Sequence, residues 1–497
     1  MAWVVEPTFV GNDNPAAPQA GILRFEVDVP ARAEVEVVGG GEQWALELSP
    51  ATEVDKPIVG LKPDTAYSLT VSVTAGDNTL TTDGLEWRTP ALPGDFPPWE
   101  VRMSHPSEME PGMTLFSPRE NWQTTQGPIV IVDHEGVVRW YFRDQDHKVQ
   151  EDLRQLENGN FLFGHDFCSL QEVDLLGNVV AMWHATEYPG GCDASSESVG
   201  VPVVDFHHDS LVLPNGNLLA LSSEARTVDG FPTDENNADA ARTTARILGG
   251  VIVEFSPDGK LVKHIAIADL IDPTRIGRDS LQTSWPSNHV PPGEPARDWD
   301  HANAVIYEKA SDCYYVSLRH QDAIIKVNRK TQQLVWILGT PANWNAPWKD
   351  KLLTPVGDLK WQYHQHAVEL TPRGLGLYDN GNYRAAAFEP VGSDPPYSRA
   401  VIYEIDEDRR EVREVWSYGE PSGDLSFYSQ GMGDADWQPQ TGNLVMVNSE
   451  LVDGPTTYAQ ILEVKPDGTR VFDLTVRGAT GSVYALYRAD RIADIRK

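Results

Sequence analysis

Three histidines that could carry chemistry are spaced in the same way relative to separate strand-like segments of the sequence. His208, His301 and His366 each stand at a similar distance before an apolar segment, and these segments begin 10, 13 and 9 residues later at Leu218, Tyr314 and Leu375. A neutral imidazole can attack an electrophile or exchange a proton, and several imidazoles together can ligate Zn, Cu or Fe. The shared spacing indicates one common site rather than scattered surface histidines.

An arginine and an aspartate accompany these histidines. Arg319 ends the strand-like segment that follows His301. Its planar guanidinium matches the oxygens of sulfate or phosphate. Asp434 lies before Leu444 at the place that the histidines occupy elsewhere. We therefore expect the site to handle an anion.

The charge of the chain limits its partners. The formal net charge of the 497 residues is −33 at pH 7, a field that repels nucleic acid and anionic membranes. An anionic substrate therefore needs a locally positive site. The sequence contains no Gly-rich phosphate loop, so we expect no nucleotide cofactor. We also expect no metal, because Arg319 beside the histidines would repel a cation.

The elements that must position these residues repeat along the chain. Each unit is a β-hairpin with an alternating first strand, a turn rich in Asp, Asn and Gly, and a second strand. The six hairpins span residues 129–140, 170–183, 251–265, 324–336, 401–416 and 461–474. Further apolar strands and Asn-Gly turns precede most of them, and residues 223–248 and 268–297 read as long insertions. Four strands repeated six times predict an all-β fold, a six-bladed β-propeller over residues 100–497.

A propeller explains the shared spacing of the candidate residues. The innermost strand of each blade runs along the central channel, so residues at equivalent strand ends face one another across the axis. The repeat therefore predicts that His208, His301 and His366 surround one channel mouth, with Arg319 beside them.

The first part of the chain predicts a different domain. Residues 1–90 contain short alternating strands, and Leu61–Tyr67 has the pattern of a tyrosine corner. We expect a small β-sandwich that resembles an immunoglobulin or fibronectin type III module. Residues 91–99 are rich in proline and predict a stiff linker.

The cysteines and the first residues of the chain are relevant to the cellular location of the protein. Of three cysteines, Cys168 and Cys192 are candidates for one disulfide. No apolar run approaches the ~20 residues that cross a bilayer. The first residues, Met1–Pro7, lack a basic start and an apolar core, so we expect no signal peptide in this chain, and a cytoplasmic protein stays open.

Several local sequences resemble the bacterial arylsulfate sulfotransferase family. The matching motifs are Phe206–Asp209, Leu213–Asn217, Asp298–Asn303, Ser317–Gln321 and Gln365–Ala367. The resemblance covers the chain from about residue 100 to its end. The Asp-Trp-x-His-x-Asn motif followed by Arg-His-Gln is fairly specific, whereas Asn-Gly-Asn turns alone are not.

The resemblance implies a reaction and residue roles. Family members move a sulfuryl group from an aryl sulfate donor to a phenolic acceptor in a ping-pong reaction without a nucleotide donor. By resemblance, His366 is the nucleophile that becomes sulfated, and His208, His301 and Arg319 hold the sulfuryl oxygens. His207 competes with His208, His364 competes more weakly with His366, and Asn303 is expected to hold a histidine tautomer. Further substrate contacts are expected from Asp434 and Tyr363. The family implies a periplasmic or secreted protein, and the oligomeric state stays open, a homodimer included.

Two other classes of function fit parts of the pattern. Three histidines at a channel mouth could form a metal-dependent hydrolase, although a neighbouring arginine would repel the metal. A propeller could also serve as a non-catalytic binding module, but a polar channel lined by histidines is costly to build without a use. Substrate specificity is expected from the insertions and from aromatic residues such as Tyr363, Tyr428 and Trp437.

Overall fold

The fold is built almost wholly of β-strands. The computed structural model describes residues 1–120, 127–144, 149–192, 195–421 and 427–496. Within these ranges the helices are four short 3₁₀ turns: η1 (Ile267–Asp269), η2 (Pro286–Asn288), η3 (Arg319–Gln321) and η4 (Trp348–Lys351). None of the helices in these ranges is long and apolar enough to cross a membrane. The predicted all-β class is confirmed.

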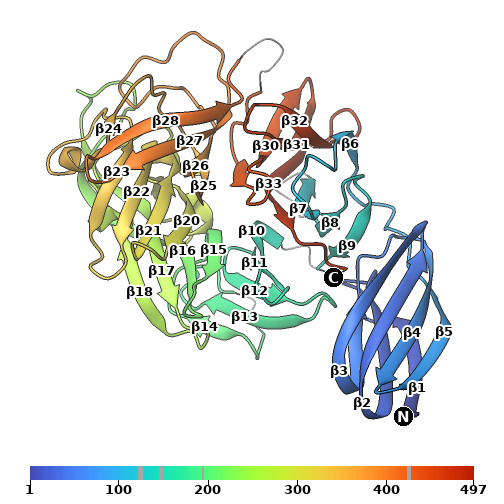
Figure 1. Cartoon of the computed structure of the whole chain (residues 1–497). Helices are drawn as coiled ribbons and strands as arrows, with labels where there is room; N and C mark the ends of the chain where they lie inside the picture. Colours follow the sequence, from blue (N-terminus) through green and yellow to red (C-terminus); the bar gives the residue numbers. More distant parts are fainter. Residues whose placement is uncertain (121–126, 145–148, 193–194, 422–426, 497) are drawn as a thin grey trace.

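Six sheets in the described part of the chain follow one another around a central axis (Figure 1) and are numbered as blades 1 to 6. Blade 1, from its inner strand outward, contains β33 (Tyr484–Ile492), β7 (Met113–Glu120), β8 (Ile129–Val132) and β9 (Val138–Phe142). Blade 2 contains β10 (Val149–Gln155), β11 (Phe161–His165), β12 (Ser169–Val173), β13 (Val179–Ala185) and β14 (Val199–Val201). Blade 3 contains β15 (His207–Val212), β16 (Leu218–Phe231), β17 (Thr243–Phe255) and β18 (Leu261–Ala266), with β19 (Arg297–Asp298) paired to β17.

The remaining three blades have the same plan. Blade 4 contains β20 (Ala302–Glu308), β21 (Cys313–Leu318), β22 (Ala323–Asn328) and β23 (Leu334–Gly339). Blade 5 contains β25 (His366–Thr371), β26 (Gly374–Asp379), β27 (Arg399–Asp406), β28 (Glu411–Tyr418) and the outer β24 (Thr354–Pro355). Blade 6 contains β29 (Asp434–Trp437), β30 (Leu444–Asp453), β31 (Thr456–Val464), β32 (Arg470–Val476) and the outer β6 (Trp99–Ser104).

The blades form a closed ring. The inner strands β10, β15, β20, β25, β29 and β33 contact one another in this order, and β33 also contacts β10. Blade 1 joins the two ends of the propeller chain, because the C-terminal β33 pairs with β7, with Tyr484 opposite Glu120. Apolar side chains pack between blades, as where Leu219 and Ile252 of blade 3 meet Val316 and Ile325 of blade 4. The six-bladed propeller is therefore confirmed by strand connectivity.

The six hairpins that the sequence predicts are the third and fourth strands of each blade, counted from the inner strand. One reading of the insertions is wrong. Residues 223–248 are not a separate insertion, because β16 and β17 continue through most of this segment as one long hairpin in which Arg226 pairs with Ile247. The second predicted insertion, residues 268–297, has no strand before β19. Its regular elements are the 3₁₀ turns η1 and η2.

The N-terminal strands form one sheet in which all five are connected by hydrogen bonds: β1 (Trp3–Gly11), β2 (Gly21–Gly39), β3 (Glu42–Ile58), β4 (Ala66–Ala75) and β5 (Asn78–Arg88). The backbone N–H of Lys62 donates to the hydroxyl of Tyr67 over 2.8 Å, which is the bond of a tyrosine corner. The immunoglobulin-like topology of residues 1–90 stays a prediction. This sheet lies beside blade 1 (Figure 1), where Arg139 donates to Glu42 over 2.7 Å.

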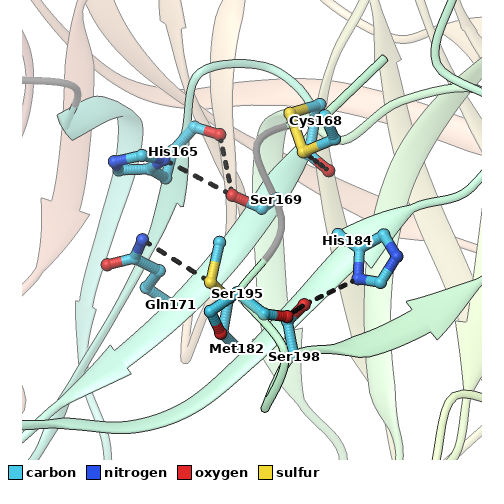
Figure 2. The surroundings of a disulfide bond; sticks show 9 residues. His165, Cys168, Ser169, Gln171, Met182, His184, Ser195 and Ser198 are labelled. Atoms are coloured by element: carbon cyan, nitrogen blue, oxygen red, sulfur yellow. Dashed lines mark hydrogen bonds between the residues drawn. A yellow bond between two sulfur atoms is a disulfide. The ribbon is translucent and has the colours of Figure 1, made fainter.

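A disulfide joins two loops of blade 2. Cys168, in the turn between β11 and β12, is bonded to Cys192, and their Cα atoms are 5.8 Å apart. Figure 2 shows this bridge beside hydrogen bonds from Ser169 to His165 and from Ser198 to His184. The disulfide that the sequence suggested is confirmed, while Cys313 is buried and free.

Candidate active site

One end of the channel gathers seven of the 13 histidines of the chain. They are His207, His208, His289, His301, His320, His364 and His366. The ring centroids of His208 and His301 are 4.9 Å apart. Tyr487 of β33 connects His208 of blade 3 with His366 of blade 5, because its ring centroid is 6.1 Å from that of His208 and 6.3 Å from that of His366. The three histidines that the sequence aligned therefore meet at one mouth.

Strand irregularities aim these three side chains. Each of the strands β15, β20 and β25 begins with a register shift, at His207–Ser210, Ala302–Ala304 and His366–Val368. The backbone enters the left-handed region there, with φ of 60° at His208, 45° at His301 and 46° at Ala367. Such bulges turn a side chain away from the regular alternation of a strand and are common beside active sites.

The tautomer of His366 is set by Asn380. The Nδ2 group of Asn380 donates to the carbonyls of Ser429 and Met432 over 2.9 and 2.8 Å, so its Oδ1 is the atom that faces His366. That oxygen can only accept a hydrogen bond, and it lies 2.7 Å from Nδ1 of His366. The proton of neutral His366 is therefore on Nδ1, and Nε2 carries the lone pair.

Burial keeps His366 neutral. Burial, followed by the positive charge of Arg319, lowers the pKa of His366 well below the usual imidazole value. The lone pair on Nε2 is thus available at neutral pH, which is what a nucleophile requires.

Arg319 is oriented by its neighbour in the sequence. Nδ1 of His320 lies 2.7 Å from the carbonyl oxygen of Asp298, which can only accept, so this nitrogen carries a proton. Nε2 of His320 then accepts from Nη1 of Arg319 over 2.5 Å. Because a second guanidinium nitrogen of Arg319 has only a long contact of 3.5 Å to the carbonyl of Gln430, the half-buried guanidinium has donor capacity left for an anion.

His301 and His208 also have defined partners. Nδ1 of His301 lies 2.7 Å from a carboxylate oxygen of Asp298, an Asp–His pair that fixes the ring and leaves Nε2 for other contacts. The Nδ1 atoms of His208 and His207 are 2.8 Å apart, so one ring donates to the other. His207 therefore acts on the site through His208, which is the one of the two whose ring contacts His301.

The pKa of one histidine of the site, His364, is shifted in the opposite direction. Burial alone would lower the pKa of His364, but Asp322 and Asp279 outweigh burial and raise it. Its Nδ1 lies 3.0 Å from Asp322 and its Nε2 lies 3.3 Å from Asp279. His364 is thus held between two carboxylates through both ring nitrogens, unlike His366.

The electrostatics of the mouth favour an anion. Burial is the largest cause of the lowered pKa values of His208 and His301, followed by neighbouring histidines for His208 and by Arg319 for His301. These rings are neutral at neutral pH, so Arg319 supplies the positive charge directed at the site. The sequence predicted a locally positive site in a chain of net charge −33, and the Arg319 guanidinium supplies that charge at this mouth.

Three other residues expected to bind substrate have different surroundings. Asn303 does not hold a histidine tautomer, since its Nδ2 donates to the carbonyl of Gln365 over 2.8 Å, next to His366. The hydroxyl of Tyr363 is hydrogen-bonded to Thr340.

Asp434 lies with another group of acids. Its carboxylate accepts from the N–H of Ala489 over 3.3 Å, and it lines a cavity of about 420 Å³ with Glu369, Asp436 and Asp490. This cavity is also lined by three arginines, Arg154, Arg488 and Arg491, and by the C-terminal ends of β10 and β33, so it lies at the other end of the channel.

Sequence reasoning missed Asn380, Trp285 and Tyr487. Asn380 follows β26 in the segment Asp379–Asn382, which reads as an ordinary turn. Trp285 lies in the insertion 268–297, which was expected to shape specificity, and its ring is 4.7 Å from that of His208. Asp298 belongs to the motif Asp298–Asn303. An aspartate three residues before His301 was the feature of the sequence that could have indicated the Asp–His pair.

The geometry fits a metal poorly. Among the described residues, ligand atoms approach within 4.8 Å of one another in two groups near the mouth, Asp279–His320–His364 and Asp298–His301–His320. Both groups need His320, whose two ring nitrogens already bind Asp298 and Arg319. A cation there would displace or face the Arg319 guanidinium. The predicted trio of His208, His301 and His366 is not among the groups found in the described part of the chain.

Comparisons with known proteins identify relatives. A family model described as Arylsulfotransferase (ASST) matches residues 100–488. A protein of Escherichia coli O6:H1 named arylsulfate sulfotransferase AssT is 28% identical over 351 residues, which are 60% of this chain and 54% of that protein. A protein of the same name from Lelliottia amnigena is 26% identical over 351 residues, with the same shares of 60% and 54%. The match thus spans about half the length of these curated relatives.

Similarity to solved structures is low. The periplasmic gluconolactonase PpgL of Pseudomonas aeruginosa is 9% identical with a TM-score of 0.36, over 76% of this chain and 99% of that chain. The Dos1 propeller is 9% identical with a TM-score of 0.29, over 79% of this chain and 95% of that chain. The assignment of the fold therefore rests on the strand connectivity.

Proposed function

This chain belongs to the arylsulfotransferase family, and we propose that it transfers a sulfuryl group from an aryl sulfate donor to a phenolic acceptor through a sulfohistidine at His366. The observation that carries the proposal is the hydrogen bond between Nδ1 of His366 and Oδ1 of Asn380. It leaves the Nε2 lone pair of a neutral, buried imidazole directed away from its anchor. A fixed lone pair beside a guanidinium suits attack on an anionic sulfur ester.

Arg319, His208 and His301 form the proposed cradle for the sulfuryl oxygens. Transfer of a sulfuryl group, like that of a phosphoryl group, passes through a loose transition state with charge on the peripheral oxygens. The guanidinium of Arg319, aimed by His320 over 2.5 Å, is a preorganised donor for that charge. Its contribution is large because the surrounding histidines are buried away from water.

The two half-reactions balance without an external reagent. In the first, Nε2 of His366 forms a bond to sulfur, the bond from sulfur to the aryl oxygen breaks, and the phenolate leaves with that electron pair and takes a proton. In the second, the acceptor oxygen bonds to sulfur as its proton is removed, and the electron pair of the S–N bond returns to Nε2. The Asp298–His301 pair is the proposed base of the second half-reaction, because neutral His301 has a lone pair on Nε2 for the acceptor's proton and the carboxylate 2.7 Å from Nδ1 stabilises the imidazolium that forms. The phenolate released in the first half-reaction takes its proton from water.

The Cys168–Cys192 disulfide supports an oxidising compartment for this protein. We place it in the periplasm or outside the cell, in line with the family.

The reaction is tested by donor–acceptor exchange. The purified chain is incubated with a nitrophenyl sulfate in the presence and absence of phenol, and nitrophenol, phenyl sulfate and free sulfate are measured. We expect nitrophenol release that depends on phenol, with phenyl sulfate formed in equal amount. Donor without acceptor should add the mass of one SO₃ group to the peptide that contains His366. The variant His366→Asn should give neither product nor adduct.

Three results would contradict the proposal. Release in water alone, with free sulfate as the product, indicates a sulfatase. Activity that is lost on chelation and restored by a stoichiometric metal indicates the metal-dependent hydrolase. No release from several aryl sulfates favours a non-catalytic binding module.

A further inference from the structure

Trp285 lies against two residues of the proposed cradle. Its ring centroid is 4.7 Å from that of His208 and 5.2 Å from that of His301. It belongs to the segment 268–297, which leads from blade 3 to blade 4. The residue is half-buried.

Two aromatic neighbours hold the indole in place. The ring of His289 packs on it with centroids 4.4 Å apart and an interplanar angle of 34°. His289 is itself fixed, because its Nδ1 lies 2.6 Å from the buried carboxylate of Asp205. Phe167, next to the disulfide residue Cys168, meets the indole edge-on at 5.2 Å. His289 and Phe167 therefore hold the indole next to the cradle.

The segment that carries Trp285 is anchored by hydrogen bonds at residues that precede it. Before Trp285, Ser280 donates to the carbonyl of Trp299 over 3.0 Å, and the N–H of Leu281 donates to Glu235 over 3.1 Å. The carbonyl of Gln282 accepts from the N–H of Asp298, the partner of His301, over 2.9 Å. The position of the indole is thus coupled to the residues that orient the cradle.

An indole at this position has two chemical consequences. An aryl ring can pack against it in an offset or edge-to-face arrangement, a contact that a non-aromatic sulfate ester lacks. The same apolar surface keeps water away from the sulfur atom that His366 holds between the two half-reactions. Both consequences affect the ratio of transfer to hydrolysis, because phenol and water compete for the same sulfohistidine.

We propose that Trp285 binds the aryl ring of donor and acceptor and, by excluding water, determines whether the sulfuryl group goes to a phenol or is lost as sulfate; this rests on the proposed function. Attack by a phenol breaks the S–N bond and gives an aryl sulfate, a free imidazole and a proton. Attack by water breaks the same bond and gives inorganic sulfate, a free imidazole and protons. The ratio of the two products therefore reports on Trp285 directly.

The test compares Trp285→Ala and Trp285→Phe with the unaltered chain. Each is given a nitrophenyl sulfate at several phenol concentrations, and phenyl sulfate and inorganic sulfate are measured. We expect Trp285→Ala to raise the KM for phenol about three- to tenfold, the usual loss for one aromatic contact. The share of inorganic sulfate should rise several-fold, and Trp285→Phe should lie between the other two. Trp416→Ala is the matched control, since Trp416 is half-buried on β28 and bonds only the carbonyl of Pro466 through its indole.

The test distinguishes a failure of the Trp285 proposal from a failure of the proposed function. An active, folded Trp285→Ala variant with the KM for phenol and the product ratio of the unaltered chain refutes the role of Trp285 and leaves the proposed function intact. A Trp416→Ala variant that shifts the ratio equally also refutes it, because the effect would then be general. Absence of phenol-dependent turnover by the unaltered chain refutes the proposed function itself. Unfolding temperatures of all variants establish that each comparison is made between folded proteins.

Discussion

Nδ1 of His366 and Oδ1 of Asn380 lie 2.7 Å apart, and the amide orientation of Asn380 is fixed by two backbone carbonyls of the neighbouring blade. The proposed nucleophile, His366 of blade 5, is therefore oriented by an amide whose own position depends on Ser429 and Met432, which precede blade 6. A neutral amide orients the ring without adding charge, so it does not oppose the lowered pKa of His366 as strongly as a carboxylate would.

Replacing Asn380 tests this relationship. Asn380→Leu removes the acceptor, so the proton of His366 is free to move to Nε2, and we expect kcat for sulfuryl transfer to fall about 10- to 100-fold with little change in KM. Asn380→Asp keeps an acceptor at Nδ1 and should recover much of the rate while raising the pKa of His366. Asn443→Ala is the control for loss of a buried amide, since Asn443 binds Glu108 and Glu463 far from the histidines. Equal losses in Asn380→Leu and Asn380→Asp would show that the tautomer is not what Asn380 controls.

Arg319 should set the acid limit of activity. Burial and then Arg319 lower the pKa of His366, so the unaltered protein should keep His366 neutral, and the first half-reaction pH-independent, from pH 8 to below 6.5. In Arg319→Met the pKa of His366 rises, and the acid limb of the single-turnover rate should move to higher pH. The maximal rate should also fall about 10²- to 10³-fold because a donor to the sulfuryl oxygens is lost. Arg319→Lys keeps the charge and should keep the acid limb near its original pH; a limb that does not move in Arg319→Met would contradict the assignment.

The sequence predicted the parts of the site that follow the repeat. The hairpins occur once per blade, so counting from them aligned His208, His301 and His366 correctly. The same count misplaced Asp434, and the reason is local. The strands β15, β20 and β25 begin with a register shift, whereas β29 pairs regularly from Asp434 to Trp437. A bulge therefore accompanies each of the three histidines and is absent at Asp434, and sequence spacing does not reveal a bulge.

Residues whose position depends on packing between blades were not predictable. Asn380 lies 14 residues after His366, in a turn, and its role depends on carbonyls that are 49 and 52 residues further along the chain. Trp285 lies in a segment without regular strands, where no periodicity indicates the direction of a side chain. By contrast, the tyrosine corner at Tyr67 and the Cys168–Cys192 pair were predictable because each depends on a short, local pattern.

Loss of the disulfide should affect both stability and the active site. Cys168 and Cys192 are separated by 24 residues, and closing a loop of this size stabilises a fold by about 3 kcal/mol. The double variant Cys168→Ser, Cys192→Ser should therefore unfold at lower denaturant concentration. Because Phe167 packs on Trp285, we also expect a larger share of inorganic sulfate among its products. Cys313→Ala removes the free cysteine and keeps the disulfide, so it serves as the control. A double variant with unchanged stability and products would contradict the prediction.

The acidic cavity at the far end of the channel should cost stability at neutral pH. Arg154, Arg488 and Arg491 also line this cavity, but Arg154 and Arg488 form ion pairs with Asp209 and Arg491 forms one with Glu463. Burial and then the neighbouring Asp434 and Asp490 raise the pKa of Asp436 well above its ordinary value. Burial likewise raises the pKa of Glu369 to about 8. In the unfolded chain both groups lose their protons near pH 4.

The sign of the effect follows from these pKa values. Between pH 4 and the raised pKa values the folded state binds more protons than the unfolded state, so the free energy of unfolding falls as pH rises through this window. Asp436→Asn removes one such group and should raise Tm at pH 8 but not at pH 4. Each kcal/mol relieved should correspond to roughly 2–4 °C at most in a chain of this size. Asp408→Asn, at an exposed aspartate, is the control for removing one negative charge from the surface. A gain in Tm that is equal at both pH values, or equal in Asp408→Asn, would mean that the cavity is not the origin of the effect.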